Sequence, residues 1–169
     1  GTVHKSAVDA VDSMPAGAKA IYSNDQLGTY DDGDAGEYNG LRYTSPSING
    51  WTLGYSIGES NANADRQSSI AVSGSVAGVS LAAGAVDDND GSDDNFFTVG
   101  YSVAGVSMGY GKYDDDNGTE SDIFGLNTSM AGLSLGYTYE DMDGSTDKDL
   151  SRYSVGKDLG GMSVTLEHT

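Results

Sequence analysis

Residues 130–140, with the sequence MAGLSLGYTYE, decide the fold of this chain. After Gly132, apolar side chains occupy every second position, and small or polar side chains lie between them. The apolar positions are Leu133, Leu135, Tyr137 and Tyr139. Successive side chains of a β-strand point to opposite faces of a sheet, so this alternation predicts a strand with one apolar and one polar face.

The same unit occurs five times along the chain. Its aligned glycines, 28, 27, 27 and 29 residues apart, are Gly50, Gly78, Gly105, Gly132 and Gly161. Each glycine lies between two stretches of period-2 alternation, and Asn49-Gly50 is a dipeptide suited to a tight hairpin turn. This repetition predicts consecutive β-hairpins. We count roughly ten strands after Gly40, each of about 9–11 residues, the length that a tilted strand needs to cross a membrane.

Polar, acidic stretches join the other ends of these hairpins. They are residues 59–65, 87–95, 114–121 and 140–149, and they carry much of a formal net charge of −18. The sequence therefore predicts an antiparallel up-and-down sheet with tight turns at one end and long acidic loops at the other. Residues 40–169 would form this sheet as part of one barrel domain, and residues 1–39, which lack clean alternation, would form a loop region.

The composition of the two faces favours a transmembrane β-barrel. A soluble barrel of this size fills its interior with bulky apolar side chains and carries charge outside. Here the second face is mainly Gly, Ser and Thr, and charged residues concentrate between the strands, the pattern of outer-membrane barrels. Aromatic side chains predicted at the membrane interfaces are Trp51, Tyr110, Tyr137 and Tyr139. A soluble β-repeat protein or sandwich, and a disordered chain, are the alternatives.

Several classes of function are disfavoured by composition. The strong negative charge argues against nucleic acid as a partner, because phosphate binding needs a basic face. The absence of cysteine excludes disulfides and thiolate chemistry, and no apolar run is long enough for a transmembrane helix. The two histidines, His4 and His168, lie at opposite ends of the chain, and no catalytic motif is present, so we do not expect an enzyme.

Residues 38–51, YNGLRYTSPSINGW, resemble a strand–turn–strand segment of Gram-negative general porins. Residues 1–12 are similar, more loosely, to the segment that leads into the porin constriction loop. The resemblance implies a 16-stranded, homotrimeric, water-filled channel in the bacterial outer membrane, through which small hydrophilic solutes and ions diffuse. Porins are about twice as long and end in an aromatic residue, whereas this chain ends Glu167-His168-Thr169, so we expect part of such a protein.

Candidate pore residues come from two sources. If the likeness to porins holds, the region of Asp9, Asp12 and Asp25 would fold into the lumen and narrow it. Strand alternation places four further charged residues on the lumen face: Arg42, Glu140, Arg152 and Glu167. Inward arginines facing carboxylates would set up a transverse field across the pore, and acidic loops at its mouth predict a preference for cations.

The acidic loops suggest two further possibilities. They contain fragments of calcium-loop patterns without the full ligand set, and the weak candidate ligands are Asp88, Asp90, Asp93, Asp141, Asp143 and Asp147. No other cofactor is expected, although divalent ions could bridge the loops to lipopolysaccharide. Two rival functions stay open: a non-conducting outer-membrane barrel acting as an adhesin or receptor through its loops, and a secreted, calcium-stabilised β-repeat protein.

Overall fold

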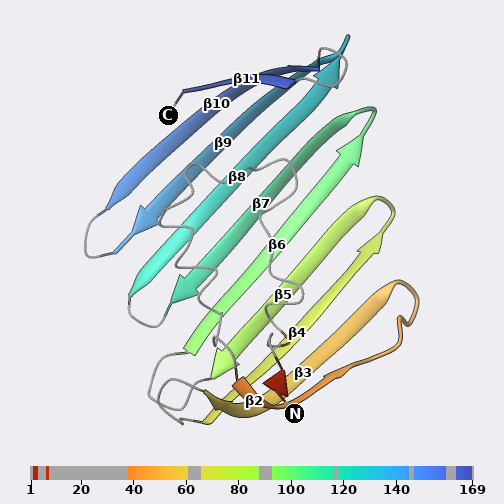
Figure 1. Ribbon diagram of the computed structural model, residues 1–169, viewed down its shortest axis with the longest axis vertical. Helices are drawn as coiled ribbons and strands as arrows, with labels where there is room; N and C mark the ends of the chain where they lie inside the picture. Colours follow the sequence, from red (N-terminus) through yellow and green to blue (C-terminus); the bar gives the residue numbers. More distant parts are fainter. Residues whose placement is uncertain are drawn as a thin grey trace.

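The computed structural model describes residues 2–3, 7, 38–60, 66–87, 93–115, 118–144, 147–158 and 163–168. These residues form one sheet of eleven antiparallel strands, each hydrogen-bonded to its neighbours in sequence (Figure 1). The strands are β1 (Thr2–Val3), β2 (Tyr38–Thr44), β3 (Trp51–Ser60), β4 (Arg66–Val76), β5 (Val79–Asp87), β6 (Asp93–Val103), β7 (Val106–Asp115), β8 (Thr119–Met130), β9 (Leu133–Asp143), β10 (Lys148–Asp158) and β11 (Ser163–His168). The predicted all-β, up-and-down arrangement is confirmed. Within the described residues the sheet is not closed, and no helix there is long and apolar enough to cross a membrane.

Four of the five predicted turns lie within the described residues and have the expected geometry. Both central residues have positive φ, with values from 50° to 53° at the first position and from 75° to 85° at the second. This conformation matches the twist of the flanking strands and favours Asn-Gly. The pairs are Asn49-Gly50, Ala77-Gly78, Ala104-Gly105 and Ala131-Gly132. The fifth, at Gly161, lies outside the described residues.

Exchanging the first turn residue should change stability in opposite directions at two of these turns. Ala104 has φ of 50°, where an alanine is strained and an asparagine is tolerated. We expect Ala104→Asn to raise the free energy of unfolding by ~1 kcal/mol, and Asn49→Ala to lower it by a similar amount. Urea titration of the folded protein in lipid vesicles measures both values. Equal effects of the same sign would contradict the turn geometry.

The strands extend further than the sequence predicted. Residues 114–121 and 140–149 were expected to be long loops, but β7 continues to Asp115, β8 begins at Thr119 and β9 continues to Asp143. That expectation is wrong because backbone pairing does not depend on side-chain polarity: the ladder continues past the apolar residues into acidic ones. Much of the acidic sequence therefore lies on strand ends.

The strands are staggered, which gives the sheet its tilt. Val76 and Val79 close the β4–β5 hairpin, and Val79 pairs with Tyr101 of β6. Strand β6 then runs two residues further, to the closing pair of Val103 and Val106. The same two-residue advance recurs at the next hairpin. A two-residue advance per hairpin is an advance of one residue per strand, or ~3.3 Å along the strand for each ~4.8 Å between neighbouring strands. This ratio corresponds to a strand tilt of about 35°, within the range found in barrels.

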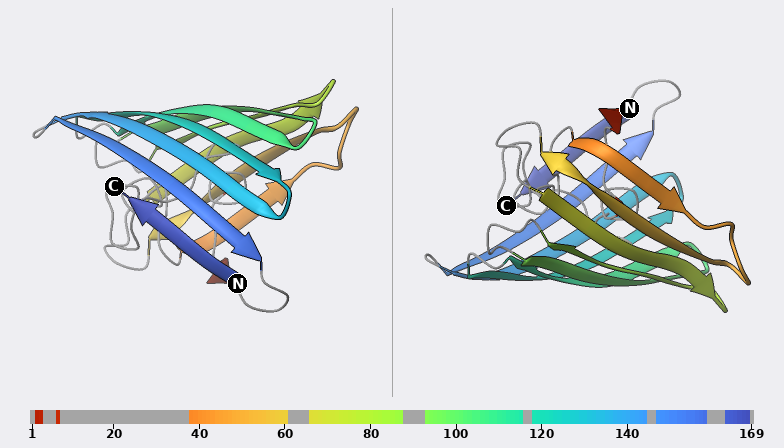
Figure 2. Two further views of the ribbon diagram at one scale, coloured as in Figure 1. Left: turned by 90° about the horizontal axis from the view of Figure 1, so that it is seen from above. Right: turned by 90° about the horizontal axis from the view of Figure 1, so that it is seen from below.

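The two faces of the sheet differ sharply in burial. One face, called the outer face, exposes a broad apolar surface from β2 to β11 that includes Leu41, Tyr43, Leu53, Ile70, Val72, Phe97, Met108, Phe124, Leu126, Leu135, Val155 and Leu166. The other, called the inner face, carries buried hydroxyl side chains such as Ser56, Ser69, Ser121, Thr138 and Ser154. The sheet curls (Figure 2), and side chains converge on the inside of a curl, so we assign the buried face to the inside.

Candidate functional site

The inner face changes character along the strands. Towards the tight turns it is lined by small residues: Gly100, Gly109 and Gly125 form a continuous cross-strand row, and beside it the hydroxyls of Ser102 and Ser107 lie 2.8 Å apart. Small side chains leave space inside a curled sheet. This part of the inner face therefore fits the small polar lining that the sequence predicted.

Towards the other strand ends, the inner face carries a buried apolar cluster, here called the inner cluster. Its members are Ala7, Ala71, Val86, Phe96, Tyr113 and Ile123. The rings of Phe96 and Tyr113 stack with centroids 6.0 Å apart, and Ile123 is completely buried. This cluster was not predicted from the sequence, since the alternation indicated Gly, Ser and Thr on this face. The available signal was a pair of adjacent apolar residues in one strand, as in Phe96-Phe97 and Ile123-Phe124, which places an apolar side chain on each face.

Both predicted inward arginines belong to the inner face by register. Arg42 pairs with Ser56 and is exposed, and Arg152 pairs with Thr138 and is half-buried. Their partners in register, Ser56 and Thr138, are buried inner-face residues.

The predicted inward carboxylates differ from one another. Glu140 lies on the inner face but is only 1% exposed, and the Ser121 hydroxyl donates a 3.0 Å hydrogen bond to its Oε1. Glu140 is therefore part of the packed wall and does not line open space. Glu167 pairs in register with Ser154, and Ser154 is an inner-face residue. Asp9, Asp12 and Asp25 lie outside the described residues.

The chain preceding β2 reaches the inner face at Ala7. The Ala7 N–H donates to the hydroxyl oxygens of Ser56 and Ser69, at 3.1 and 3.0 Å, and these two oxygens are 2.6 Å apart. Ala7 is 1% exposed and belongs to the inner cluster. At this residue, then, the segment expected to be a loop region contacts the inside of the curl, and β1 pairs with β2.

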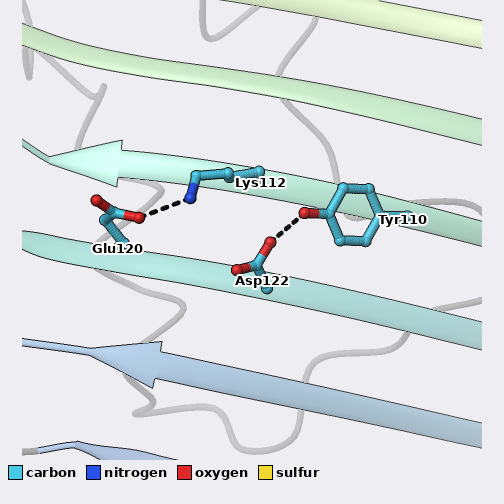
Figure 3. Close-up of polar contacts among 4 residues, drawn as sticks. All are labelled: Tyr110, Lys112, Glu120 and Asp122. Atoms are coloured by element: carbon cyan, nitrogen blue, oxygen red, sulfur yellow. Dashed lines mark hydrogen bonds and ion pairs between the residues drawn. The ribbon is translucent and has the colours of Figure 1, made fainter.

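The outer face ends in a rim of aromatic and charged side chains on β7 and β8 (Figure 3). Lys112 Nζ lies 2.6 Å from Glu120 Oε2 in an exposed ion pair, and the Tyr110 hydroxyl donates to Asp122 Oδ1. On β9 the Tyr139 hydroxyl donates a 2.8 Å hydrogen bond to Asp149 of β10. These tyrosines join an apolar surface to charged strand ends, as side chains at a membrane interface do.

The other two predicted interface aromatics lie elsewhere on the outer face. The ring of Tyr137 contacts those of Phe124 and Tyr153, with centroids 6.5 and 5.0 Å apart, so it lies within the apolar surface. Trp51 follows the first tight turn, and a Cβ at Gly74 would come within 2.6 Å of its indole ring. An aromatic ring over a cross-strand glycine is a known way of covering a weak point in a strand.

The candidate calcium ligands do not form a site in the described part of the chain. Asp141 and Asp143 alternate with the inner residue Met142 and so lie on the outer face, and Asp147 accepts a 3.4 Å hydrogen bond from the Gly144 N–H. Among the described residues, no three Asp, Glu or His side chains are grouped closely enough to hold a metal ion. Asp88 and Asp90 fall outside these residues, and Asp93 begins β6.

Comparison with known proteins gives a match at the level of structure. No family model and no curated protein sequence matches the chain. Three solved structures of engineered variants of the Rhodopseudomonas blastica porin do match. A variant with five substitutions has a TM-score of 0.64 at 20% identity, and a triple mutant has 0.64 at 21%. In each, the match covers 77% of this chain and 49% of the porin chain, so about half of the porin's length is represented. The chain therefore has the fold of a bacterial porin.

Proposed function

We propose that this chain is part of an outer-membrane porin that forms a water-filled channel for the passive diffusion of small hydrophilic solutes and ions. The observation that carries the proposal is the reversed arrangement of polarity in a porin-like sheet: the outer face exposes most of the large apolar residues, and the inner face buries hydroxyl-bearing residues as well as the small inner cluster. Exposed apolar patches on soluble monomers rarely exceed a few hundred Å². A lipid bilayer is the environment that suits an apolar surface running across ten strands.

The same features support localisation in the bacterial outer membrane. Only helices and closed barrels satisfy all backbone hydrogen bonds within lipid, and the porin fold is a barrel of this kind. We propose that further strands close the barrel, 16 in all, and that the barrel assembles as a trimer, as the resemblance to porins implies. Acidic strand ends beyond the apolar surface would then lie near the headgroups of lipopolysaccharide.

The distribution of charge supports a preference for cations that arises at the pore mouth. The described inner face carries charges of both signs: Arg42, Lys148 and Arg152 against Asp94 and Glu140. The excess negative charge lies on strand ends and between strands. A mouth dominated by one sign raises the local concentration of counter-ions. The region of Asp9, Asp12 and Asp25 would add to this field if it narrows the lumen, and Ala7 on the inner face supports that placement.

Removing an inward arginine should shift ion selectivity further towards cations. We expect Arg152→Gln and Arg42→Gln each to move the zero-current potential in a salt gradient towards that of a more cation-selective pore, because each removes a positive charge from the inner face. The measurement is the reversal potential of the native protein and of each variant in planar bilayers. An unchanged potential would contradict the lumen position of the residue tested.

Diffusion itself is tested by liposome swelling. Vesicles containing the detergent-extracted native protein should swell in isotonic solutions of small sugars, and the rate should fall as the sugar becomes larger. Vesicles that swell no faster than protein-free controls would contradict the channel, provided that the protein is folded in them.

A further inference from the structure

The outer face contains a hollow of about 340 Å³ that spans β3 to β6, near the strand ends opposite the tight turns. Residues that line it from outer positions in the register are Tyr55, Ser68, Ile70, Ala85, Asp87 and Asn95. Ser69 and Val86 also line it, but their side chains are buried on the inner face, so they contribute backbone atoms to its floor. This space, here called the β4–β5 hollow, therefore opens outwards from the curl.

A small side chain in a row of larger ones creates the hollow. Tyr55, Ile70, Ala85 and Asn95 follow one another in register across four strands, and the Ala85 side chain ends at its Cβ. Beside it, the side chains of Ile70 and Tyr55 are 51% and 44% exposed and form a wall. A depression left empty in an apolar surface loses dispersion contacts, which a flexible hydrocarbon chain can restore. The β4–β5 hollow therefore suits an acyl chain.

The end of the hollow nearest the acidic strand ends is polar and carries charges of both signs. Ser68 pairs in register with Asp87, and Arg66, two residues before Ser68 on the same face, pairs with Glu59. Asp114 of β7 adds a third carboxylate to this region of the outer face. Like charges at an interface oppose binding, so this end disfavours a headgroup whose only charge is negative and favours one with an ammonium group.

We propose that the β4–β5 hollow binds a membrane phospholipid with an ammonium headgroup. An acyl chain lies over Ala85 against the wall of Tyr55 and Ile70, and the headgroup lies at the polar end, with its ammonium towards Asp87 and its phosphate towards Arg66. The inference rests on the proposed contact of the outer face with lipid. It adds a particular place on that face and a particular headgroup chemistry.

Filling the hollow tests the place. The detergent-extracted native protein is mixed with phosphatidylethanolamine, and the lipid that stays bound is counted by native mass spectrometry. We expect Ala85→Phe to weaken retention roughly tenfold, the effect of losing about two buried methylene groups. The matched control is Ala83→Phe, which adds the same ring on the outer face of β5, next to Phe97 in register and outside the described lining of the hollow. It should retain lipid as the native protein does. Equal retention by the two variants would overturn the proposed place.

Competition between two lipids with identical acyl chains tests the headgroup. The native protein should prefer phosphatidylethanolamine to phosphatidylglycerol, and Asp87→Asn should remove this preference while a lipid is still bound. Asp141→Asn, which removes a carboxylate from the outer face of β9, should leave the preference unchanged. A native protein that binds both lipids equally, or that prefers phosphatidylglycerol once magnesium is added, would overturn the assignment of an ammonium headgroup.

Lipid retention and conduction are measured separately, so the two proposals can fail independently. A native protein that conducts in a planar bilayer but retains no phosphatidylethanolamine rejects the lipid site and keeps the channel. A folded protein that retains this lipid at the hollow but does not conduct keeps the lipid site and rejects the channel. A protein that stays folded and monomeric in water without detergent rejects both.

Discussion

Leu126→Arg should destabilise the folded protein by about 2–4 kcal/mol, the cost of a cationic side chain on the lipid face of a barrel near the bilayer midplane. Leu126 is on the outer face of β8, 37% exposed, and lies between Phe124 and Thr128, away from both strand ends. Because the bilayer core offers no water to the guanidinium, the folded state loses stability while the unfolded state does not. Urea unfolding in lipid vesicles measures the change in free energy.

The adjacent residue supplies the control. Asn127 is half-buried and points to the inner face. Asn127→Arg adds the same charge one residue away and should cost much less, because its guanidinium reaches the water of the lumen. If both variants were equally stable, or if Asn127→Arg were the worse one, the assignment of lipid to the outer face would be wrong.

Ile123→Ala should destabilise the protein by about 2–5 kcal/mol, since it removes a fully packed side chain and leaves a cavity. Ile123 is completely buried in the inner cluster, opposite Gly111 on one strand and Glu140 on the other. The prediction is specific to this structure, because a barrel lined only by small polar residues would have no such packing to lose. Equilibrium unfolding measures the loss.

An isoleucine on the outer face provides the comparison. Ile70 is 51% exposed, and its truncation to alanine loses a similar transfer free energy but leaves no fixed cavity, since lipid chains fill the space. Ile70→Ala should therefore cost measurably less than Ile123→Ala. A larger loss for Ile70→Ala would contradict the packed inner wall.

Much of the fold could be predicted from the sequence because its signals are local. Alternation identified both faces of β9, and the repeated x-Gly pairs identified turns whose positive φ the structure bears out at Asn49-Gly50 and three later pairs. The face of each strand residue follows from the same alternation, and in register Arg42 pairs with Ser56 and Arg152 with Thr138.

What could not be predicted depends on contacts between distant parts of the chain. Parity places Glu140 on the inner face but does not show that this position is covered, whereas the structure leaves it 1% exposed. The inner cluster joins residues from β4 to β8, and the Ala7 N–H donates hydrogen bonds to serines 49 and 62 residues away. The strands were predicted to end too early for a related reason. Polar residues such as Asp114 are assigned to loops unless their pairing partners on the neighbouring strand are known.

The most direct test of the account is the single-channel conductance of the native, detergent-extracted protein in a planar bilayer under a potassium chloride gradient. We expect stepwise, long-lived openings and a reversal potential on the cation-selective side. A silent bilayer from a protein that is folded and inserted would contradict the channel, and would favour a closed barrel that acts through its acidic strand ends.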